Sequence, residues 1–366
     1  MMRTRLNRTM GNQDGMALLV AIMTLAVLVV VTVQYGKDNW HALLLSDNYK
    51  TRSQLKAAAD SGVHLGIALL QQDQKDDEYD TLLDIWNQAA QSELTGMFSN
   101  ISLQVTITDL SGRIQVNSLR LSEENNENAG EGGEGADAGE EGEGGEGGEG
   151  GEGGEGGRPA EEVAILLNNL LLSENFSLEE REAKEIVDSL IDWVDEDDDE
   201  SENGAENSYY QSLRRPYNCR NAPVQSIEEL LLVKGITSEI LYGTEGKTGL
   251  GEYITVYGDD ALININTADV AVIRGFDPLI SEELAESFHE HRTDEEHREQ
   301  LGQLHWYRNL GGWPGDISLN ERLITVKSRY FQIKAVARMD EIAVQIVADI
   351  ERSEEESVDI LKRLME

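Results

Sequence analysis

The 366-residue chain has very little cysteine and few basic side chains. Its single cysteine, Cys219, excludes an intramolecular disulfide and leaves the redox compartment open. Only 30 lysine and arginine residues stand against 70 aspartate and glutamate residues, so the formal net charge is −40. This charge disfavours nucleic acid and anionic lipid as partners of the soluble part, and it makes divalent cations suitable ligands instead.

Aromatic residues make up 6% of the chain, yet 39% hydrophobic residues are enough for a sizeable core. The G-x-S-x-G, H-E-x-x-H and P-loop motifs are all missing from the sequence. His289, His291 and His297 lie close in sequence, but no two of them are three or four residues apart, which disfavours a zinc site on a helix. We therefore expect a protein that is not an enzyme, with Cys219 in no catalytic pair.

Residues 16–36 contain no charged residue at all. As an α-helix rising ~1.5 Å per residue, this segment is about 30 Å long, which is enough to cross a bilayer core. Three arginines precede it, and positive charge on the short leading side predicts a single-pass protein with a cytoplasmic N-terminus. Helix-forming sequence follows where a signal peptide would have its cleavage motif. We predict one long helix over residues 16–70, with its first half in lipid and a soluble head on its second half.

The small residue lies before the apolar run, at Gly15, and Met16 follows it. A basic leader that ends in glycine, then an apolar helix that continues into a soluble head, resembles the precursors of type IV pilins and type II secretion pseudopilins. The resemblance implies that a prepilin peptidase cuts between Gly15 and Met16, that residues 1–15 are removed, and that the new N-terminus is methylated. A plain N-terminal anchor without processing is the alternative.

Val20 stands five residues into the mature helix, where most members of that family have glutamate. In the family this glutamate is thought to pair with the N-terminal ammonium of a neighbouring subunit. A carboxylate in lipid is costly unless it is paired, and a subunit with no neighbour ahead of it has no use for one. The absence of this glutamate therefore resembles the minor pseudopilin K type, which is placed at the filament tip.

Period-two alternation of apolar residues predicts the strands of the head. Residues 101–119 alternate on both sides of the turn sequence DLSGR and predict a β-hairpin, and residues 328–339 and 341–353 predict a second strand pair. The fold class we expect is α+β: a pilin-like long N-terminal transmembrane helix packed on a small antiparallel sheet. Everything between the two strand pairs predicts a large, mainly α-helical inserted domain.

A Gly/Glu-rich tract opens this insertion. It has no large apolar side chains to offset the entropy of ordering, so we expect a disordered tether. The alternative, a calcium-binding β-helix, needs an apolar residue and an aspartate in each repeat, and both are missing. The expected divisions are the leader 1–15, the transmembrane segment 16–36, the first part of the head 37–120, the tract 121–158, the inserted domain 159–322 and the closing strands 323–366.

The acidic segment DEDDDESENGAE, residues 195–206, carries the most specific chemistry. Counted from Asp195, oxygen-bearing residues occupy the other ligand positions of an EF-hand-type calcium loop, namely Asp197, Asp199, Ser201, Asn203 and Glu206. The sixth position, normally glycine, is Glu200, so the loop departs from a regular EF-hand. A solvated acidic run is the alternative.

The segments SLIDWVDEDDDESENGAENSYY, LLLVKGI, YITVYGDDALININTA and SRYF occur in the order found in the type II secretion minor pseudopilin K family. With the N-terminus they cover most of the chain outside the Gly/Glu tract. That family binds calcium in this domain, so the resemblance implies a structural Ca²⁺ ion on Asp195, Asp197 and Glu206. It extends less directly to Asp192 and to Asn207, which replaces the family's last acid and keeps an oxygen ligand.

The resemblance also implies a function and a location. The chain would start or cap a short pseudopilus for protein export across the outer membrane, anchored in the bacterial inner membrane with its main domain in the periplasm. The implied partners are the I-type and J-type minor pseudopilins and the prepilin peptidase, with the secreted substrate or the outer-membrane secretin as further candidates.

A membrane-anchored DNA-binding protein of the competence type is the alternative, because residues 226–236 and 263–276 resemble pieces of a helix-hairpin-helix module. Those segments contain only Lys234 and Arg274 as basic residues, among many acids. Phosphate binding depends on such residues, so we read both segments as packing units and expect no nucleic acid.

Overall fold

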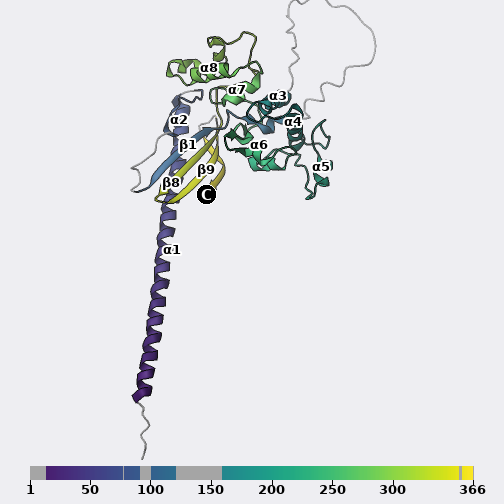
Figure 1. Cartoon of the computed structure of the whole chain (residues 1–366). Helices are drawn as coiled ribbons and strands as arrows, with labels where there is room; N and C mark the ends of the chain where they lie inside the picture. The colour runs from purple at the N-terminus through teal and green to yellow at the C-terminus, as the bar shows by residue number, and fades with distance from the viewer. Residues whose placement is uncertain (1–13, 77, 91–99, 121–158, 354–356, 366) are drawn as a thin grey trace, which may run out of the picture.

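The computed structural model describes residues 14–76, 78–90, 100–120, 159–353 and 357–365. The Gly/Glu-rich tract and all but the last two residues of the leader lie outside these ranges. Figure 1 shows a long helix whose upper part packs on a sheet, with the inserted domain beside and above that sheet. The α+β class and the pilin-like arrangement predicted from the sequence are confirmed.

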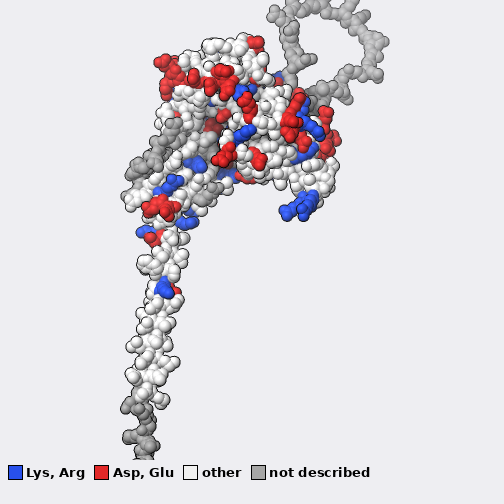
Figure 2. All heavy atoms as spheres, viewed as in Figure 1, with Lys and Arg blue, Asp and Glu red and all other residues white. Residues whose placement is uncertain are grey.

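Helix α1 runs over Asp14–Asp76, so the single long helix predicted over residues 16–70 is confirmed. Among the described helices it is the one long and apolar enough to cross a membrane. Its side chains are exposed over residues 15–50, and packing on the head begins at Leu55. In Figure 2 the uncharged segment of α1, residues 16–36, carries no charged side chains, whereas acidic side chains spread over the head and the inserted domain.

Two glycines of α1 let the helix lie directly on the sheet. A β-carbon at Gly62 would come within 2.9 Å of the Ala335 β-carbon, and one at Gly66 within 2.8 Å of the Ile333 side chain. Carbon atoms do not normally approach so closely, so a larger residue at either position would push the helix away. The small residues therefore fix the distance between α1 and the sheet.

The head sheet has four antiparallel strands in the order β1-β8-β9-β10. Their bounds are Ser102–Asp109 for β1, Tyr330–Met339 for β8, Ile342–Arg352 for β9 and Val358–Met365 for β10. The second predicted strand pair is confirmed as β8 and β9. Strand β10 was not predicted separately, because as an edge strand it exposes side chains on both faces and shows no period-two pattern. The sheet, α1 and the short helix α2 (Ile85–Ala90) enclose the smaller hydrophobic core.

The hairpin predicted over residues 101–119 is wrong in its second half. β1 pairs with β8, whereas the next segment leaves the sheet and pairs in parallel with a strand of the inserted domain. Ser111 causes this exit: its N–H donates to the Asp109 carboxylate, and its hydroxyl accepts the N–H groups of Arg329 and Tyr330. The alternating Ile114 and Val116 are fully buried, but in the core of the inserted domain.

The inserted domain consists of short helices, 3₁₀ turns and two-residue strands around the larger hydrophobic core. Its elements are β2 (Ile114–Gln115), η1 (Val116–Leu119), α3 (Pro159–Leu172), α4 (Glu180–Val194), α5 (Asn207–Ser212), η3 (Ile227–Leu232), α6 (Ser238–Tyr242), β3 (Gly243–Thr244), β4 (Lys247–Thr248), η4 (Leu250–Glu252), β5 (Ile254–Thr255), β6 (Ile263–Asn264), α7 (Val270–Phe276), α8 (Glu282–Arg292), η5 (Glu295–Gly302), η6 (Trp306–Asn309) and β7 (Ile324–Thr325). Its core also takes in residues 114–119 and 323–326, which lie inside the ranges expected for the head.

Candidate functional site

The acidic loop lies between α4 and α5, which hold its two ends. The inward face of α4 is buried in the larger core, as its apolar spacing requires. Asp195 is the residue at which α4 ends, and its N–H donates to the carbonyl of Ile191. Glu206 is the residue just before α5, and its side chain accepts the N–H of Asn207. The first and twelfth positions of the predicted calcium loop are thus both fixed by helix termini.

Asp192, on the last turn of α4, organises the loop from inside. Its carboxylate is fully buried and accepts the backbone N–H groups of Ser201 at 3.2 Å and Ala205 at 2.7 Å. Gly204 lies directly against this carboxylate, and a β-carbon there would overlap it. Carboxylates that accept backbone N–H groups stabilise the turn they close. Asp192 therefore folds the loop back onto α4.

Asp188 and Lys234 complete this framework. The Asp188 carboxylate accepts both the backbone N–H and the side-chain amide of Asn203. The Lys234 ammonium donates to the carbonyl oxygens of Asn203 at 3.1 Å and Gly204 at 2.9 Å. The ninth-position side chain thus turns away from the centre of the loop, and Lys234 is occupied by the loop.

Asp195 and Glu206 each have a side-chain oxygen whose hydrogen-bonding capacity is not satisfied within the loop. Both side chains are buried, and one carboxylate oxygen of each, Oδ1 of Asp195 and Oε1 of Glu206, has no hydrogen-bond partner. Burial, together with neighbouring carboxylates such as Asp197 and Asp192, raises the pKa of Asp195 to about 7. Burial and Asp192 also raise the pKa of Glu206 to about 7. A buried carboxylate oxygen without a hydrogen-bond partner is a group that a bound divalent cation would satisfy, so the two unpartnered oxygens fit Ca²⁺.

The other predicted ligands are placed differently. Asp197 is exposed at the mouth of the loop, where it accepts the N–H of Asp199. The Asn207 side-chain oxygen accepts the N–H of Cys219, and its amide donates to Asp198. Among the described residues, no three of the carboxylates Asp192, Asp195, Asp197 and Glu206 bring ligand oxygens within 4.8 Å of one another. Asp192, Asp195 and Glu206 are buried and Asp197 is exposed, and the structure does not bring them together into one tight cluster.

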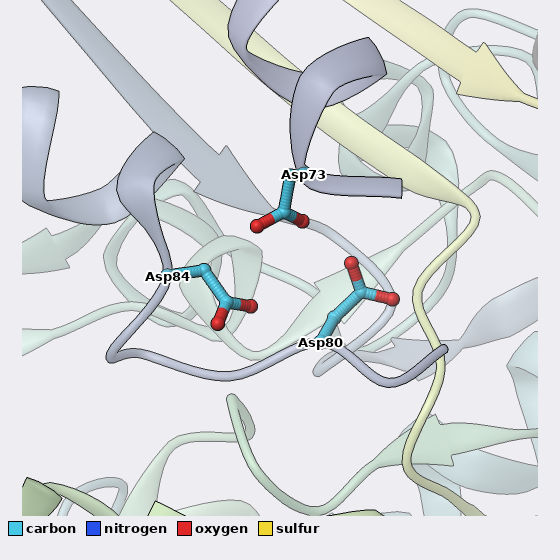
Figure 3. A group of neighbouring side chains, drawn as sticks. All are labelled: Asp73, Asp80 and Asp84. Atoms are coloured by element: carbon cyan, nitrogen blue, oxygen red, sulfur yellow. The ribbon is translucent and has the colours of Figure 1, made fainter. Parts of the chain in front are cut away.

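A second carboxylate cluster, which the sequence did not reveal, joins α1 to the inserted domain. Asp73 near the end of α1, Asp80 in the following loop and Asp84 just before α2 point toward one another (Figure 3). All three are buried, and their oxygens lie within 4.8 Å of one another. We call these three residues the junction cluster.

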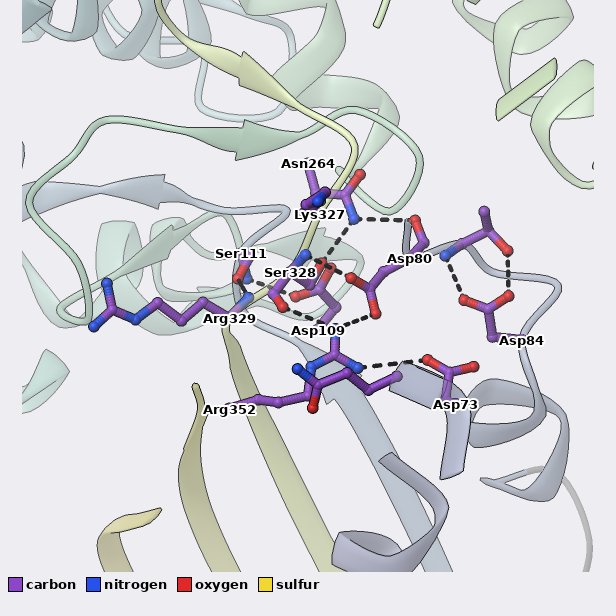
Figure 4. A network of polar contacts seen from close by, with 12 residues as sticks. Asp73, Asp80, Asp84, Asp109, Ser111, Asn264, Lys327, Ser328, Arg329 and Arg352 are labelled. Carbon is purple, nitrogen blue, oxygen red and sulfur yellow. Dashed lines mark hydrogen bonds and ion pairs between the residues drawn. The ribbon is translucent and has the colours of Figure 1, made fainter. Parts of the chain in front are cut away.

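Two arginines contact the three carboxyl groups of the junction cluster, so the cluster is part of a network of polar and ionic contacts. Arg352, the last residue of β9, lies 3.5 Å from Asp73, pairs with Asp80, and donates to the Ser328 carbonyl at 2.9 Å (Figure 4). Arg298 in η5 reaches Asp84 at 2.8 Å. No local sequence pattern predicts these pairs, because their members lie more than two hundred residues apart.

Asp109 extends the network across the boundary between sheet and insertion. Its buried carboxylate accepts the hydroxyl groups of Thr267 and Ser328, and burial raises its pKa to about 6. Asn264 donates to the Ser328 hydroxyl at 2.7 Å and to the Asp80 carbonyl at 3.1 Å (Figure 4). The end of β1, the start of β8 and the insertion strand β6 are thereby held together by buried polar contacts.

Raising the pH from 6 to 8 is expected to lower the free energy of unfolding through Asp73. Burial, with Asp84 and Asp80 nearby, raises the pKa of Asp73 to about 8. The folded chain therefore keeps a proton that the unfolded chain releases near pH 4, and the stability it brings is lost as the pH rises through 8. The effect is about 2 kcal/mol, from ~1.4 kcal/mol per pH unit.

Urea unfolding at both pH values measures this change, and Asp73→Asn is the matched control. The variant should lose about 2 kcal/mol of the difference between pH 6 and pH 8, whatever other groups contribute. An Asp73→Asn chain with the same pH dependence as the unsubstituted chain would show that Asp73 does not hold the proton.

The histidines form a pair that the sequence argument missed. The rings of His291 and His297 stack with centroids 3.8 Å apart, and His291 also stacks on Trp306 at 5.3 Å. The chain turns at Thr293, after α8, and η5 then runs back along α8. His291 and His297, six residues apart, therefore meet although they share no helix face. Parallel rings do not aim their nitrogens at one cation, and these rings serve as packing around Trp306.

The two segments that resemble helix-hairpin-helix pieces are built into the inserted domain. Residues 226–236 contain η3, and residues 263–276 contain β6 and α7, all packed in the larger core. Lys234, one of their two basic residues, donates to the acidic loop. The DNA-binding alternative therefore finds no support.

Comparisons with known proteins agree with this architecture. A family model described as type II secretion system protein K matches residues 152–245. The type II secretion system protein K of Pectobacterium carotovorum is 25% identical over 343 residues, which cover 90% of this chain and 89% of that protein. Its counterpart in Aeromonas hydrophila is 23% identical over 367 residues, 96% of this chain and 97% of that protein.

One solved structure has the same fold. It is the crystal structure of the GspK-GspI-GspJ complex from the type 2 secretion system of enterotoxigenic Escherichia coli. One of its chains matches with a TM-score of 0.62 and 16% sequence identity, over 88% of this chain and 99% of that chain. The similarity extends over both the head and the inserted domain.

Proposed function

Because the chain belongs to the type II secretion system protein K family and is a minor pseudopilin, we propose that it caps or starts the secretion pseudopilus at its tip. The inserted domain is the observation that carries this proposal. It occupies residues 159–326 and packs beside the head sheet, where a subunit in the body of a filament would meet its neighbours. Such a subunit fits best where one side is unoccupied, and Val20 removes the carboxylate that would contact a subunit ahead.

The partners we propose are the I-type and J-type minor pseudopilins. The solved relative that shares this fold was crystallised as a GspK-GspI-GspJ complex, which supports the choice. The uncharged segment of α1 would anchor the chain in the inner membrane and place the head in the periplasm. The secreted substrate and the outer-membrane secretin are the further contacts we propose for the exposed end.

Calcium is proposed as a structural ion of the acidic loop. Asp195 and Glu206 would hold it through their unpartnered oxygens, with Asp197 on the open side. The ion would neutralise two buried carboxylates that each have one oxygen without a hydrogen-bond partner, and so stabilise the folded loop. Asp192 serves the site by shaping the loop through its bonds to Ser201 and Ala205.

Processing should remove the leader between Gly15 and Met16. The intact mass of the chain from a host with a prepilin peptidase is expected to match residues 16–366 with one N-terminal methyl group. A peptidase-deficient host is the control and should yield the full-length mass. A mature chain that retains Met1, or one cut after the apolar segment, would contradict the proposal.

Immunogold labelling of overproduced pseudopili tests the proposed placement. An epitope tag after Met365 is expected to be labelled at one end of each filament, whereas the major pseudopilin is labelled along the whole length. Regular labelling of this chain along the filament body would show that the insertion can be accommodated between neighbours, and the tip assignment would then be wrong.

A further inference from the structure

The head and the inserted domain have separate hydrophobic cores. Among the residues that the structure describes, no side chain belongs to both cores. The loop between α1 and α2 lies against both, because Leu83 is buried in the larger core and Leu82 packs against the smaller one. The chain itself passes between head and insertion at residues 110–113 and 327–329. Contacts across this boundary therefore decide how firmly the inserted domain is held on the head.

Buried polar groups connect the two sides. From the head, Arg352 at the end of β9 pairs with the Asp80 carboxylate and donates to the Ser328 carbonyl at 2.9 Å. From the insertion, Asn264 donates to the Asp80 carbonyl at 3.1 Å and to the Ser328 hydroxyl at 2.7 Å (Figure 4). Asp80, a member of the junction cluster, and Ser328 therefore link the head to the insertion. Domain interfaces held by polar contacts permit relative motion more readily than large apolar ones.

The charges at the junction do not balance when every group is ionised. Asp109 acts electrostatically on Asp80 of the junction cluster, and Arg352 and Arg298 are the bases that contact the cluster. Four buried carboxylates against two guanidinium groups would leave two negative charges without compensation. Burying a charge without a partner is costly, and a carboxyl group keeps its proton instead. At least one of the four should therefore be protonated in the folded chain.

Asp73 is the carboxyl group best placed to keep the proton. Among the described residues it accepts no backbone N–H, whereas Asp80 accepts one from Ser328 at 2.7 Å and Asp84 accepts one from its own turn at 2.6 Å. Its distance to Arg352 is 3.5 Å. A protonated Asp73 can donate to Asp80, since their oxygens lie within 4.8 Å of one another. Burial and the neighbouring Asp84 and Asp80 raise the pKa of Asp73 to about 8, which agrees with this assignment.

We propose that the junction is a pH-sensitive switch: a proton on Asp73 keeps the inserted domain closed on the head, and loss of this proton opens the boundary while both cores stay folded. An opened junction admits water, so Asp73 would there have the pKa of an exposed aspartate, about 4. The proton therefore stabilises the closed form fully below about pH 4. Above that pH its contribution falls about tenfold per pH unit, and it is lost once the pH has passed about 8.

The other charged groups at the junction either act in the same direction or do not titrate in this range. Asp80 and Asp84 from the following loop and Arg352 from β9 face Asp73, while Arg298 of η5 contacts Asp84 and Asp109 of β1 acts on Asp80. Both arginines stay charged. Burial raises the pKa of Asp109 to about 6, so this group ionises before Asp73 and also adds negative charge as the pH rises. Opening between pH 6 and pH 8 therefore depends mainly on Asp73.

Hydrogen exchange of the full-length chain in detergent at pH 6 and pH 8 tests the switch. The amide groups of Asp80 and Ser328 report on the junction, whereas those of Leu190 in α4 and Ala335 in β8 report on the two cores. After correction for intrinsic exchange rates, protection of the junction amides should fall at least tenfold from pH 6 to pH 8. It should stay below the protection of the core amides at both pH values, and low urea should speed exchange in the cores but not at the junction.

Two substitutions identify the group that holds the proton. Asp73→Asn keeps a neutral side chain of the same size, so protection at the junction should change no more than about twofold between pH 6 and pH 8. Asp60→Asn is the control, because Asp60 lies on the same helix but pairs with Arg363 at a partly exposed position, and it should keep the full change. An Asp73→Asn chain with an unaltered pH dependence would overturn the proposal. So would junction amides of the unsubstituted chain that exchange together with the core amides, with equal protection and equal dependence on urea.

Discussion

Replacing Arg352 with alanine is expected to lower the free energy of unfolding by about 3–5 kcal/mol. The Arg352 side chain is buried and compensates two buried carboxylates, Asp73 and Asp80, while it also donates to the Ser328 carbonyl. Removing one partner of a buried ion pair leaves the other charges without compensation, which costs far more than the pair itself contributes. The loss should be largest above pH 8, where Asp73 can no longer remain protonated.

Urea denaturation of the full-length chain in detergent measures this loss, and Arg329→Ala is the matched control. Arg329 also pairs with a carboxylate of β9, Glu351, but its side chain is 58% exposed. Exposed ion pairs contribute at most about 1 kcal/mol, so this variant should stay close to the unsubstituted chain. An equal loss of free energy of unfolding in the two variants would show that burial does not increase the contribution of the Arg352 ion pairs.

Chelation of calcium is expected to lower the melting temperature of the chain by roughly 5–10 °C. An ion present at one hundred times its dissociation constant adds about 2.7 kcal/mol to the folded state, and 1 kcal/mol corresponds to about 2–4 °C in a domain of this size. Asp195→Asn and Glu206→Gln should each abolish the difference between calcium and EDTA, since each removes one of the buried carboxylates with an unpartnered oxygen.

Glu202→Gln is the control for the calcium experiment, because Glu202 lies in the same loop but is exposed and occupies no predicted ligand position. It should keep the full calcium effect. Identical melting curves in calcium and EDTA for the unsubstituted chain would contradict the proposal that the loop binds calcium.

Cys219 provides an independent readout of the same loop. Its thiol is buried and donates to the Asp192 carbonyl at 3.4 Å, and its N–H donates to Asn207. A thiol reagent should therefore modify Cys219 at least tenfold faster in EDTA than in calcium. Equal rates would mean that the loop keeps its structure without the ion.

Local periodicity explains which parts of the fold the sequence predicts. Strands β8 and β9 follow from apolar spacing, because each buries one face over many residues. The long helix follows from its uncharged segment and the helix-forming sequence after it. The alternation at Ile114 and Val116 predicted burial correctly but not the partner, since a buried strand in the insertion needs the same pattern as a hairpin strand. The exit of the chain involves Ser111, whose hydroxyl accepts N–H groups that lie more than two hundred residues away in the sequence.

In the candidate site, too, the sequence predicts the features that are local in the chain and misses the contacts between distant residues. The acidic loop is local in sequence, so counting positions located Asp195 and Glu206 between two helix ends. Counting loop positions could not show that the Asp192 carboxylate accepts the N–H groups of Ser201 and Ala205, because these hydrogen bonds depend on how the loop folds back onto α4. The junction cluster was missed altogether, since Arg352 meets Asp73 and Asp80 only after the chain has left the head and returned.

The most direct test of the tip assignment is the stoichiometry of the full-length chain purified in detergent with the other minor pseudopilins. Native mass spectrometry is expected to show a monomer when the chain is alone and a 1:1:1 complex when the I-type and J-type proteins are present. A chain that instead forms polymers with itself, or that replaces the major pseudopilin along a filament, would contradict the account.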